Sequence, residues 1–382
     1  MIVFLSDIPW DALHQRPQQL ASRLAREGPL LWVEPATISR RHFYTPVTLE
    51  AGLFRMTLPM IPLNARNRRV RQIAGVLSRI ALIRRLLGSI QRTLLRRGLR
   101  RTGTPGERVA FLVENFQLIG LVDCIPSAYV VFDYIDDAFG FTSLPPFVHA
   151  LWESALRRAD VVTATSSTLA ERLQAVFPRE VRIIRNGVQY DRFSTEGGTA
   201  GRPGDLPPEG QPVVGYIGSV YPWIDYDLIA TTLSAMRDVQ FVMIGQDHPD
   251  VGKHLARLRA FPNFHFLGVR PYAMVPLYLR YIDAGLIPFR RTSLTEGVNP
   301  VKLYEYSAAG IPTIATDFSD DMHEFTEMVL IARSADEFIR HIRTALTRRG
   351  QPAFVNSLRA FARANDWDSR SRLFSEFLHP HT

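Results

Sequence analysis

Cysteine and lysine are scarce in this 382-residue sequence, and each shortage narrows the possible functions. The single cysteine, Cys124, excludes a disulfide framework and a zinc site built from cysteines, and it is typical of a reducing compartment such as the cytosol. Only two lysines occur, Lys253 and Lys302, so nearly all basic positions are arginines. A lysine inside a motif is therefore a stronger hint of function than usual.

Long apolar runs are also missing. No stretch approaches 18 uncharged apolar residues, so no transmembrane helix is expected. The start of the chain has a short apolar run without a preceding basic segment, so no signal peptide is expected either. Hydrophobic residues at 46% and charged residues at 21% exclude a disordered, collagen-like or coiled-coil chain. The length predicts two domains.

Acidic residues are absent from one long segment. Residues 51–106 contain thirteen arginines and no Asp or Glu. Subtracting these thirteen charges from the net charge of +8 leaves −5 for the rest of the chain. The sequence therefore predicts a mildly acidic protein that carries one basic patch.

Short apolar strands alternate with helical patterns along both halves of the chain. The predicted strands are 2–5, 30–33, 110–113, 128–132, 161–164 and 181–184 in the first half, and 213–217, 240–244, 264–267, 284–288 and 313–315 in the second. This alternation predicts an α/β fold with two doubly wound, Rossmann-like domains that face a cleft. The expected boundaries are a first domain at 1–193, a Gly/Pro-rich linker at 194–212, a second domain at 213–360, and a helical tail at 361–382.

The strongest local signal is the segment from Asn299 to Pro312, N-P-V-K-L-Y-E-Y-S-A-A-G-I-P. Asn299 is expected to cap a helix whose first residue is Pro300. A helix N-terminus with Lys302 in its first turn suits a diphosphate, and Glu305 on nearly the same face suits a ribose diol. The alternative is a well-capped surface helix with a Lys–Glu pair.

This segment resembles the donor-site motif N-P-x-K-x-x-E-Y-x-A-x-G-x-P of bacterial glycosyltransferases with the GT-B fold. Four weaker motifs follow the family's order, namely 14–20, 184–188 at the hinge between domains, 214–219, and 263–268. The resemblance covers most of the chain. It is closest to xanthan-type glucuronosyltransferases and related envelope or exopolysaccharide enzymes.

The resemblance implies a nucleotide site in the second domain, with the loop 268–272 at the base. The residues expected to bind the nucleotide are Lys302, Glu305, Asn299, Val301, Gly218, Ser219 and Arg270. Many retaining members have two glutamates separated by seven residues, whereas eight separate Glu296 from Glu305 here. The usual basic pair after the first strand of this domain is missing as well, so Lys302 has to bind more of the phosphate. The pattern is closer to inverting enzymes.

An inverting transferase needs a general base for the acceptor hydroxyl. Asp136, which follows a first-domain strand, is the residue that the resemblance favours, with Asp137 and Asp133 as alternates. A D-x-D-like Mn²⁺ site and simple capping of the next helix are the other readings of these aspartates. Because the helix start and Lys302 balance the diphosphate, we expect neither a metal nor another cofactor.

Polar residues after two other first-domain strands are expected to border the acceptor. They are Asp7, Trp10, His14, Arg16 and Glu114. Trp10 suits stacking on a sugar, and His14 or Arg16 suits a phosphate. The alternative is a packed tryptophan beside a solvated helix start.

The basic segment 64–103 predicts an amphipathic helix from Val70 to Arg101. The arginines expected to meet anionic head groups are Arg71, Arg79, Arg85, Arg92, Arg96 and Arg97. Packing of the apolar face on its own domain is the alternative. A nucleic-acid partner is not expected, because no recognised binding module accompanies the arginines.

Together these features predict a metal-independent glycosyltransferase of polysaccharide biosynthesis, a hexosyltransferase that is associated peripherally with the cytoplasmic face of the plasma membrane. It would transfer a sugar from a nucleotide-sugar, UDP-linked by preference, to a lipid- or glycan-linked acceptor, with inversion. A retaining transferase or an epimerase of the same fold is the alternative. A basic, non-catalytic protein that binds nucleic acid or membranes is the alternative of another class.

Overall fold

The computed structural model describes residues 1–12, 14–36, 42–63, 68–103, 108–141, 146–177, 179–194 and 201–378. The chain forms two compact units. The first comprises Met1–Ile184 with Arg370–Thr382, and the second comprises Arg185–Ser369. No described helix has the length and apolar character needed to cross a bilayer.

The first unit is built on an eight-stranded sheet in the order β3-β4-β2-β1-β5-β6-β7-β8. Its strands are β1 (Ile2–Leu5), β2 (Leu30–Pro35), β3 (Val47–Glu50), β4 (Leu53–Leu58), β5 (Ala110–Val113), β6 (Tyr129–Tyr134), β7 (Val161–Ala164) and β8 (Val181–Ile183). All neighbours are parallel except β3 and β4. The strand order reverses between β1 and β5, which places the topological switch point there.

Helices cover this sheet, and the last helix of the chain returns to it. They are α1 (Arg16–Leu24), α2 (Arg68–Arg79), α3 (Ala81–Thr102), η1 (Phe116–Cys124), α4 (Ala138–Phe141), α5 (Pro146–Arg158), α6 (Ser167–Gln174) and α15 (Trp367–Leu378). The hairpin of β3 and β4 was not expected. It turns at Gly52, whose φ of +78° favours glycine.

The second unit has a six-stranded parallel sheet in the order β11-β10-β9-β12-β13-β14. Its strands are β9 (Val213–Ile217), β10 (Gln240–Ile244), β11 (Phe264–Gly268), β12 (Ala284–Ile287), β13 (Thr313–Thr316) and β14 (Val329–Ala332). Here the order reverses between β9 and β12. The continuous apolar runs of β9, β10 and β12 are buried along nearly their whole length, as in sheets that are covered on both faces.

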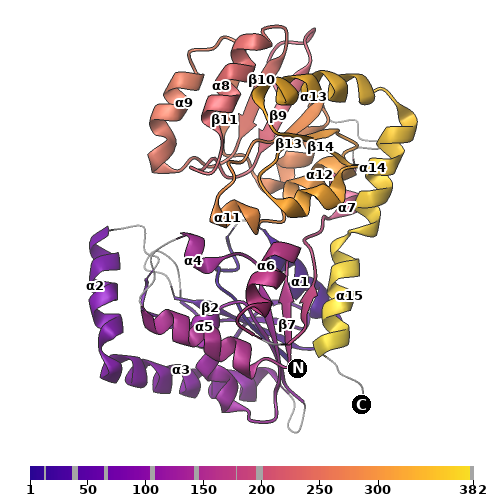
Figure 1. Cartoon of the computed structure of the whole chain (residues 1–382). Coiled ribbons are helices and arrows are strands. Elements are labelled where there is room, and N and C mark those ends of the chain that lie inside the picture. Colours follow the sequence, from indigo (N-terminus) through magenta and orange to yellow (C-terminus); the bar gives the residue numbers. More distant parts are fainter. Residues whose placement is uncertain are drawn as a thin grey trace. The chain divides into compact units, whose positions relative to one another are not determined.

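The helices of the second unit include the donor-motif helix predicted from the sequence. They are α7 (Tyr190–Phe193), α8 (Tyr226–Ala235), η2 (Pro249–Val251), α9 (Gly252–Leu258), η3 (Tyr272–Met274), α10 (Val275–Leu279), α11 (Ser293–Glu296), α12 (Val301–Ala308), η4 (Asp320–Phe325), α13 (Ala335–Arg348) and α14 (Pro352–Ala364). Figure 1 shows α14 lying along α12. The Tyr304 and Phe361 rings stack there with centroids 5.6 Å apart.

The boundary between the units lies after Ile184, nine residues before the expected end of the first domain. Residues 201–212, expected to belong to an interdomain linker, lie in the second unit, and residues 195–200 fall outside the described part of the chain. Asp205 explains this placement, because its carboxylate accepts hydrogen bonds from Arg270 and Tyr278. The chain thus passes between units at 184–185 and again at 369–370.

The basic segment is not the single helix that the sequence predicted. Ile80 adopts an extended conformation and separates α2 from α3, which run in different directions in Figure 1. The Arg84 guanidinium donates a hydrogen bond of 2.6 Å to the Ser78 carbonyl. This bond gives a partner to one of the carbonyl groups left unpaired at the C-terminal end of α2. Residues 64–67 lie outside the described residues.

The exposed side of α2 carries apolar side chains among its arginines. Ile73 is 61% and Val76 63% exposed, whereas Ala74 and Ser78 are buried. Arg71 and Arg79 on α2, and Arg85, Arg96 and Arg97 on α3, are exposed as expected. Arg92 differs, because it is partly buried on the inner side of α3.

Candidate functional site

Two loops meet at the switch point of the second sheet, where β9 and β12 end. Gly218 follows β9, and α12 lies beyond the end of β12. Open parallel sheets bind ligands at such a position. A Cβ placed on Gly218 would lie 3.1 Å from both Cε and Nζ of Lys302, so the two loops are in direct contact. Gly218 also has a φ of +143°, which suits glycine.

The Lys302 ammonium lies between two aromatic rings. Its Nζ is 5.1 Å from the ring centroid of Tyr216 and 5.1 Å from that of Phe289. Cation–π contacts of this kind stabilise a charge without neutralising it. Among the described residues no carboxylate or carbonyl bonds to this nitrogen, and burial lowers the pKa of Lys302 to about 8, with Glu305 opposing. A partly desolvated cation without an anionic partner is suited to a ligand phosphate.

Glu305 lies one turn further along α12, on the same side as Lys302. The Tyr272 hydroxyl donates a hydrogen bond of 3.2 Å to Glu305 Oε1. Burial raises the pKa of Glu305 to about 7, while Lys302 and the Tyr272 hydrogen bond oppose the rise. Tyr272 belongs to the loop predicted to meet the nucleotide base, so the structure brings that loop to the predicted ribose ligand. Sequence reasoning missed this contact.

Asn299 does not cap α12, contrary to the prediction. The N-cap residue is Pro300, and no side chain caps the helix. The Asn299 Oδ1 atom instead accepts from the Asn186 backbone N–H at 2.8 Å and from the Tyr304 hydroxyl at 3.1 Å. Asn186 Nδ2 donates to the Asn299 carbonyl at 2.7 Å. The hinge segment, residues 184–188, therefore holds the start of α12. The backbone N–H groups at this helix start have no side-chain cap and remain available to a ligand.

The other predicted nucleotide ligands differ in whether their polar groups already have partners within the protein. Val301 is the first residue of α12. Ser219 accepts a hydrogen bond from the Tyr216 hydroxyl through its carbonyl, at 2.6 Å. Arg270 is engaged elsewhere, because its guanidinium pairs with Asp205 and donates to the Tyr278 hydroxyl at 2.8 Å. A role for Arg270 toward the nucleotide stays a prediction.

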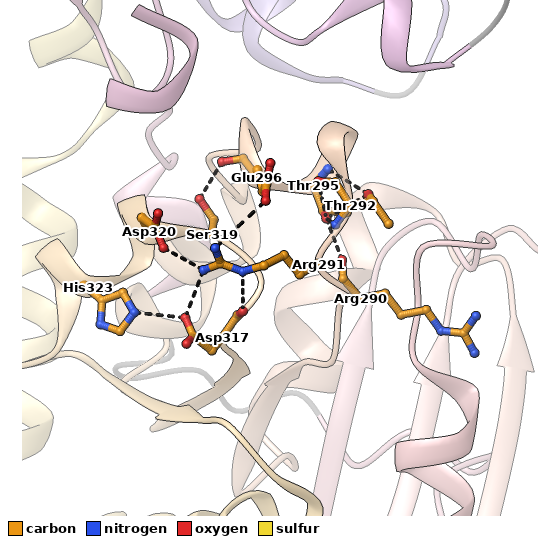
Figure 2. A network of polar contacts seen from close by, with 9 residues as sticks. All are labelled: Arg290, Arg291, Thr292, Thr295, Glu296, Asp317, Ser319, Asp320 and His323. Carbon is orange, nitrogen blue, oxygen red and sulfur yellow. Dashed lines mark hydrogen bonds and ion pairs between the residues drawn. The ribbon is translucent and has the colours of Figure 1, made fainter. Parts of the chain in front are cut away.

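The loop before α12 is fixed by a polar network that Figure 2 shows. Arg291 lies at its centre and contacts Asp320 at 2.6 Å, Asp317 at 3.3 Å and Glu296 at 3.9 Å. The Ser319 hydroxyl donates to the Glu296 carbonyl at 2.5 Å. Glu296, the loose match to the first glutamate of retaining enzymes, is therefore tied to Arg291.

Three side chains of this network lie close enough to hold a cation, namely Asp317, Asp320 and His323. His323 Nε2 lies 2.9 Å from Asp317 Oδ1 (Figure 2). The Arg291 guanidinium already supplies positive charge to both carboxylates. Against the effect of burial, the hydrogen bond from His323, with Arg291 and Arg333, holds the pKa of Asp317 below its usual range. The cluster is thus an ion-pair network that supports the loop.

The first unit brings its predicted acceptor residues to the carboxyl ends of β1, β5 and β6. Arg16 and Asp133 form a buried bidentate pair there, with Nε–Oδ2 2.8 Å and Nη2–Oδ1 3.0 Å. The Thr163 hydroxyl donates to the same carboxylate at 2.6 Å. Arg16 is 2% and Asp133 1% exposed. The structure therefore supports neither Arg16 as a direct acceptor ligand nor Asp133 as the base.

Asp136 and Asp137 differ in their surroundings. Asp137 accepts from the Phe139 N–H at 3.1 Å and lies 3.4 Å from the Arg172 guanidinium, so it caps α4. Asp136 accepts no hydrogen bond from the described residues. Burial raises the pKa of Asp136 to about 6, with Arg16 lowering and Asp137 raising it. A half-buried carboxylate with a pKa near neutrality is suited to general-base catalysis.

Glu114, which was predicted to border the acceptor, is instead a buried carboxyl group. It is 5% exposed, and neither carboxyl oxygen has a hydrogen-bond partner among the described residues. Burial and the nearby Asp133 raise its pKa well above the usual range, with Arg16 opposing. Burial therefore favours the protonated, neutral form of Glu114.

The remaining acceptor-side candidates line the loop after β1. Asp7 is exposed. Trp10 packs edge-on against Trp32, with ring centroids 5.1 Å apart, and His14 lies 5.8 Å from the Trp10 ring. Stacking of Trp10 on a sugar stays a prediction.

Comparisons with known proteins agree with the fold. Residues 211–348 match the family described as glycosyl transferases group 1. This match lies within the second unit and covers about a third of the chain. The resemblance and the fold class predicted from the sequence are thereby confirmed, because solved structures with the same two-domain GT-B fold align with the whole chain.

The individual relatives are distant. TuaH of Bacillus subtilis (strain 168), named as a teichuronic acid biosynthesis glycosyltransferase, is 26% identical over 228 residues. This alignment spans 58% of the chain and 57% of TuaH. WaaG, a glycosyltransferase involved in lipopolysaccharide biosynthesis, superposes with a TM-score of 0.63 at 16% identity, covering 100% of both chains. Anabaena HepE, in complex with UDP and glucose, gives 0.67 at 13% identity, covering 100% of this chain and 99% of that one.

Proposed function

We propose that this protein transfers a sugar from a UDP-sugar to a lipid- or glycan-linked acceptor of the cell envelope, with inversion at the anomeric carbon. The observation that carries the proposal is the Lys302 ammonium, which lies between two rings at the uncapped start of α12 and has no anionic partner among the described residues. UDP is chosen because HepE, which has the same fold, binds it.

In this proposal the diphosphate lies against the α12 N-terminus and Lys302. Glu305 accepts hydrogen bonds from the ribose hydroxyls. The acceptor hydroxyl oxygen attacks the anomeric carbon, the bond from that carbon to the diphosphate oxygen breaks, and Asp136 takes the hydroxyl proton. Lys302 and the helix N–H groups stabilise the charge that develops on the leaving UDP, as a preorganised site can without a metal.

The acceptor class rests on two kinds of support. TuaH is named for teichuronic acid biosynthesis and WaaG for lipopolysaccharide biosynthesis, and these names favour a glycan or glycolipid acceptor. The exposed apolar residues of α2 and α3, of which Leu82 is 74% exposed, lie among the exposed arginines. Apolar side chains that enter the bilayer interface, flanked by arginines that meet anionic head groups, bind a protein to a membrane surface. These side chains support the proposal that the enzyme works at the membrane surface, which we propose to be the inner face of the plasma membrane.

A thermal-shift screen of nucleotide sugars on the full chain tests the proposal, since a ligand of the native state raises the melting temperature. UDP-sugars should raise it more than the GDP-, ADP- and dTDP-linked sugars, and the sugar that raises it should release UDP when membrane lipid extract is added. A chain that responds to none of them, or only to another nucleotide, would contradict the proposal.

A further inference from the structure

The first unit contains an apolar hollow between α3, η1 and α5. Its volume is about 290 Å³. Eight of its fourteen lining residues have apolar side chains, two are glycines and four are polar. An apolar hollow of this size with a few polar groups is typical of a site for a small apolar ligand or part of one.

The polar residues give the hollow a positive rim. Arg84 and Arg92 both line it, and no carboxylate of the described residues pairs with either. The Arg84 guanidinium rests over the Phe147 ring, 5.0 Å from its centroid. A ligand that matches this lining has a hydrocarbon part and an anionic group at its end.

Two glycines, one on α3 and one on η1, belong to the lining of the hollow. A Cβ on Gly88 of α3 would meet only the Arg92 guanidinium, at 3.4 Å, and one on Gly120 of η1 would meet nothing within 4 Å. Glycine inside a helix costs about 1 kcal/mol relative to alanine. Gly88 therefore leaves space in the hollow that the side chain of a better helix former would fill.

The hollow adjoins the acceptor side of the first unit. Met60 lines it, and the Met60 sulfur accepts a weak hydrogen bond of 3.7 Å from Asn115 Nδ2. The same nitrogen lies 3.4 Å from the Ser6 carbonyl, at the carboxyl end of β1. Asn115 directly follows Glu114, so one side chain separates the apolar hollow from the predicted acceptor loops.

From this juxtaposition we infer that the hollow binds the first part of the hydrocarbon chain of a lipid-phosphate-linked acceptor, with Arg84 and Arg92 near its phosphate. The inference rests on the proposed function and adds to it a site for the lipid. The carrier's chain enters beside α3, and its sugar end reaches the strand ends where Asp136 lies.

Titration of farnesyl phosphate into the full chain, below its micelle concentration, tests the inference. Gly88→Leu and Gly120→Leu fill the hollow from α3 and from η1. Each should weaken binding at least about tenfold, because two or more methylene groups then stay in water. Gly75→Leu on α2, where a Cβ also meets nothing within 4 Å, is the matched control and should bind as the unchanged protein does. Inorganic phosphate alone should bind far more weakly.

Unchanged binding in both filled variants, or no binding to the unchanged protein, would overturn the inference. So would a loss of binding to phosphatidylglycerol vesicles in the filled variants while farnesyl phosphate binds normally, because a bulk lipid would then be the occupant. The thermal shift by UDP-sugar, measured on the same samples, separates the two proposals. If that shift persists without farnesyl phosphate binding, only the lipid site fails.

Discussion

At the scale of single residues, burial moves the pKa values of Lys302 and Glu305 toward each other. The pKa of Lys302 is lowered to about 8 and that of Glu305 is raised to about 7. Nucleotide binding needs the charged form of both, so the affinity for a UDP-sugar should be greatest between about pH 7 and 8. It should fall below this range as Glu305 gains a proton and above it as Lys302 loses one.

Isothermal titration of UDP-glucose from pH 5.5 to 9.5 measures this profile. Glu305→Gln should remove the acidic limb and Lys302→Met the alkaline limb. A flat profile in the unchanged protein would show that these two groups do not contact the ligand.

Glu114 gives a second prediction from titration, this time for stability. Its folded pKa lies well above the usual value of 4.5, so between these two values the folded protein holds a proton that the unfolded chain has lost. The free energy of unfolding therefore falls as the pH rises through this window. Glu114→Gln keeps the shape without the titration, so it should raise the melting temperature at pH 8 and leave it nearly unchanged at pH 4. A lower melting temperature at pH 8 would mean that Glu114 is ionised and paired.

Asp136 is the residue whose replacement separates binding from chemistry. Asp136→Asn should lower the transfer rate by about a hundredfold or more, the usual contribution of a general base, and leave the dissociation constant for UDP within a factor of two. Asp137→Asn is the matched control and should retain most of the activity at some cost in stability. Transfer by Asp136→Asn at the normal rate would place the base elsewhere.

At the scale of elements, α2 exposes the face that a helix of a soluble domain would bury. Replacing Ile73, Val76 and Leu82 together by serine should abolish co-sedimentation with phosphatidylglycerol vesicles, because these side chains are 61%, 63% and 74% exposed. The melting temperature should change little, since exposed side chains contribute little to folding. Val176→Ser, at a site that is 60% exposed and outside these helices, is the control. Vesicle binding that survives the triple change would assign these residues to a protein partner.

Apolar sequence patterns were sufficient to predict most strands but not the break between α2 and α3 or the edge strand β3. Continuous apolar runs such as 213–217 predicted strands because both faces of the sheets are covered, which leaves few other uses for such a run. The break at Ile80 carried no signal, since an isoleucine within an apolar sector fits a continuous helix equally well. The edge strand β3 was missed because its residues are at most half-buried.

At the scale of the whole molecule, the failures involve partners that are distant in sequence. Asn299 before Pro300 has the local pattern of a cap, but its partner Asn186 lies 113 positions away. Arg16 at a helix start has the pattern of a solvated ligand, but it pairs with Asp133, 117 positions away. The sequence could place Lys302 and Glu305 together because one helix turn carries both, whereas the contact of Glu305 with Tyr272 spans 33 positions.

The segments next to the two points where the chain changes unit are hydrogen-bonded to each other within the second unit. The Val188 N–H donates to the Asn365 carbonyl at 3.2 Å, and the Trp367 N–H donates to the Val188 carbonyl at 3.0 Å. The Tyr190 N–H donates to Asp366 at 2.7 Å. Because Asn186 also binds Asn299, the hinge segment is linked directly to the start of α12. A change of conformation at residues 184–188 would therefore act on the proposed phosphate site.

The most direct measurement is the affinity of UDP for Lys302→Ala beside Lys253→Ala, the only other lysine of the chain. Charge-assisted hydrogen bonds are worth about 1.5–3 kcal/mol, so Lys302→Ala should bind UDP at least about tenfold more weakly by calorimetry at pH 7.5. Lys253→Ala, whose side chain is exposed on α9, should match the unchanged protein. Equal UDP affinity in all three proteins would show that the diphosphate does not bind at the start of α12.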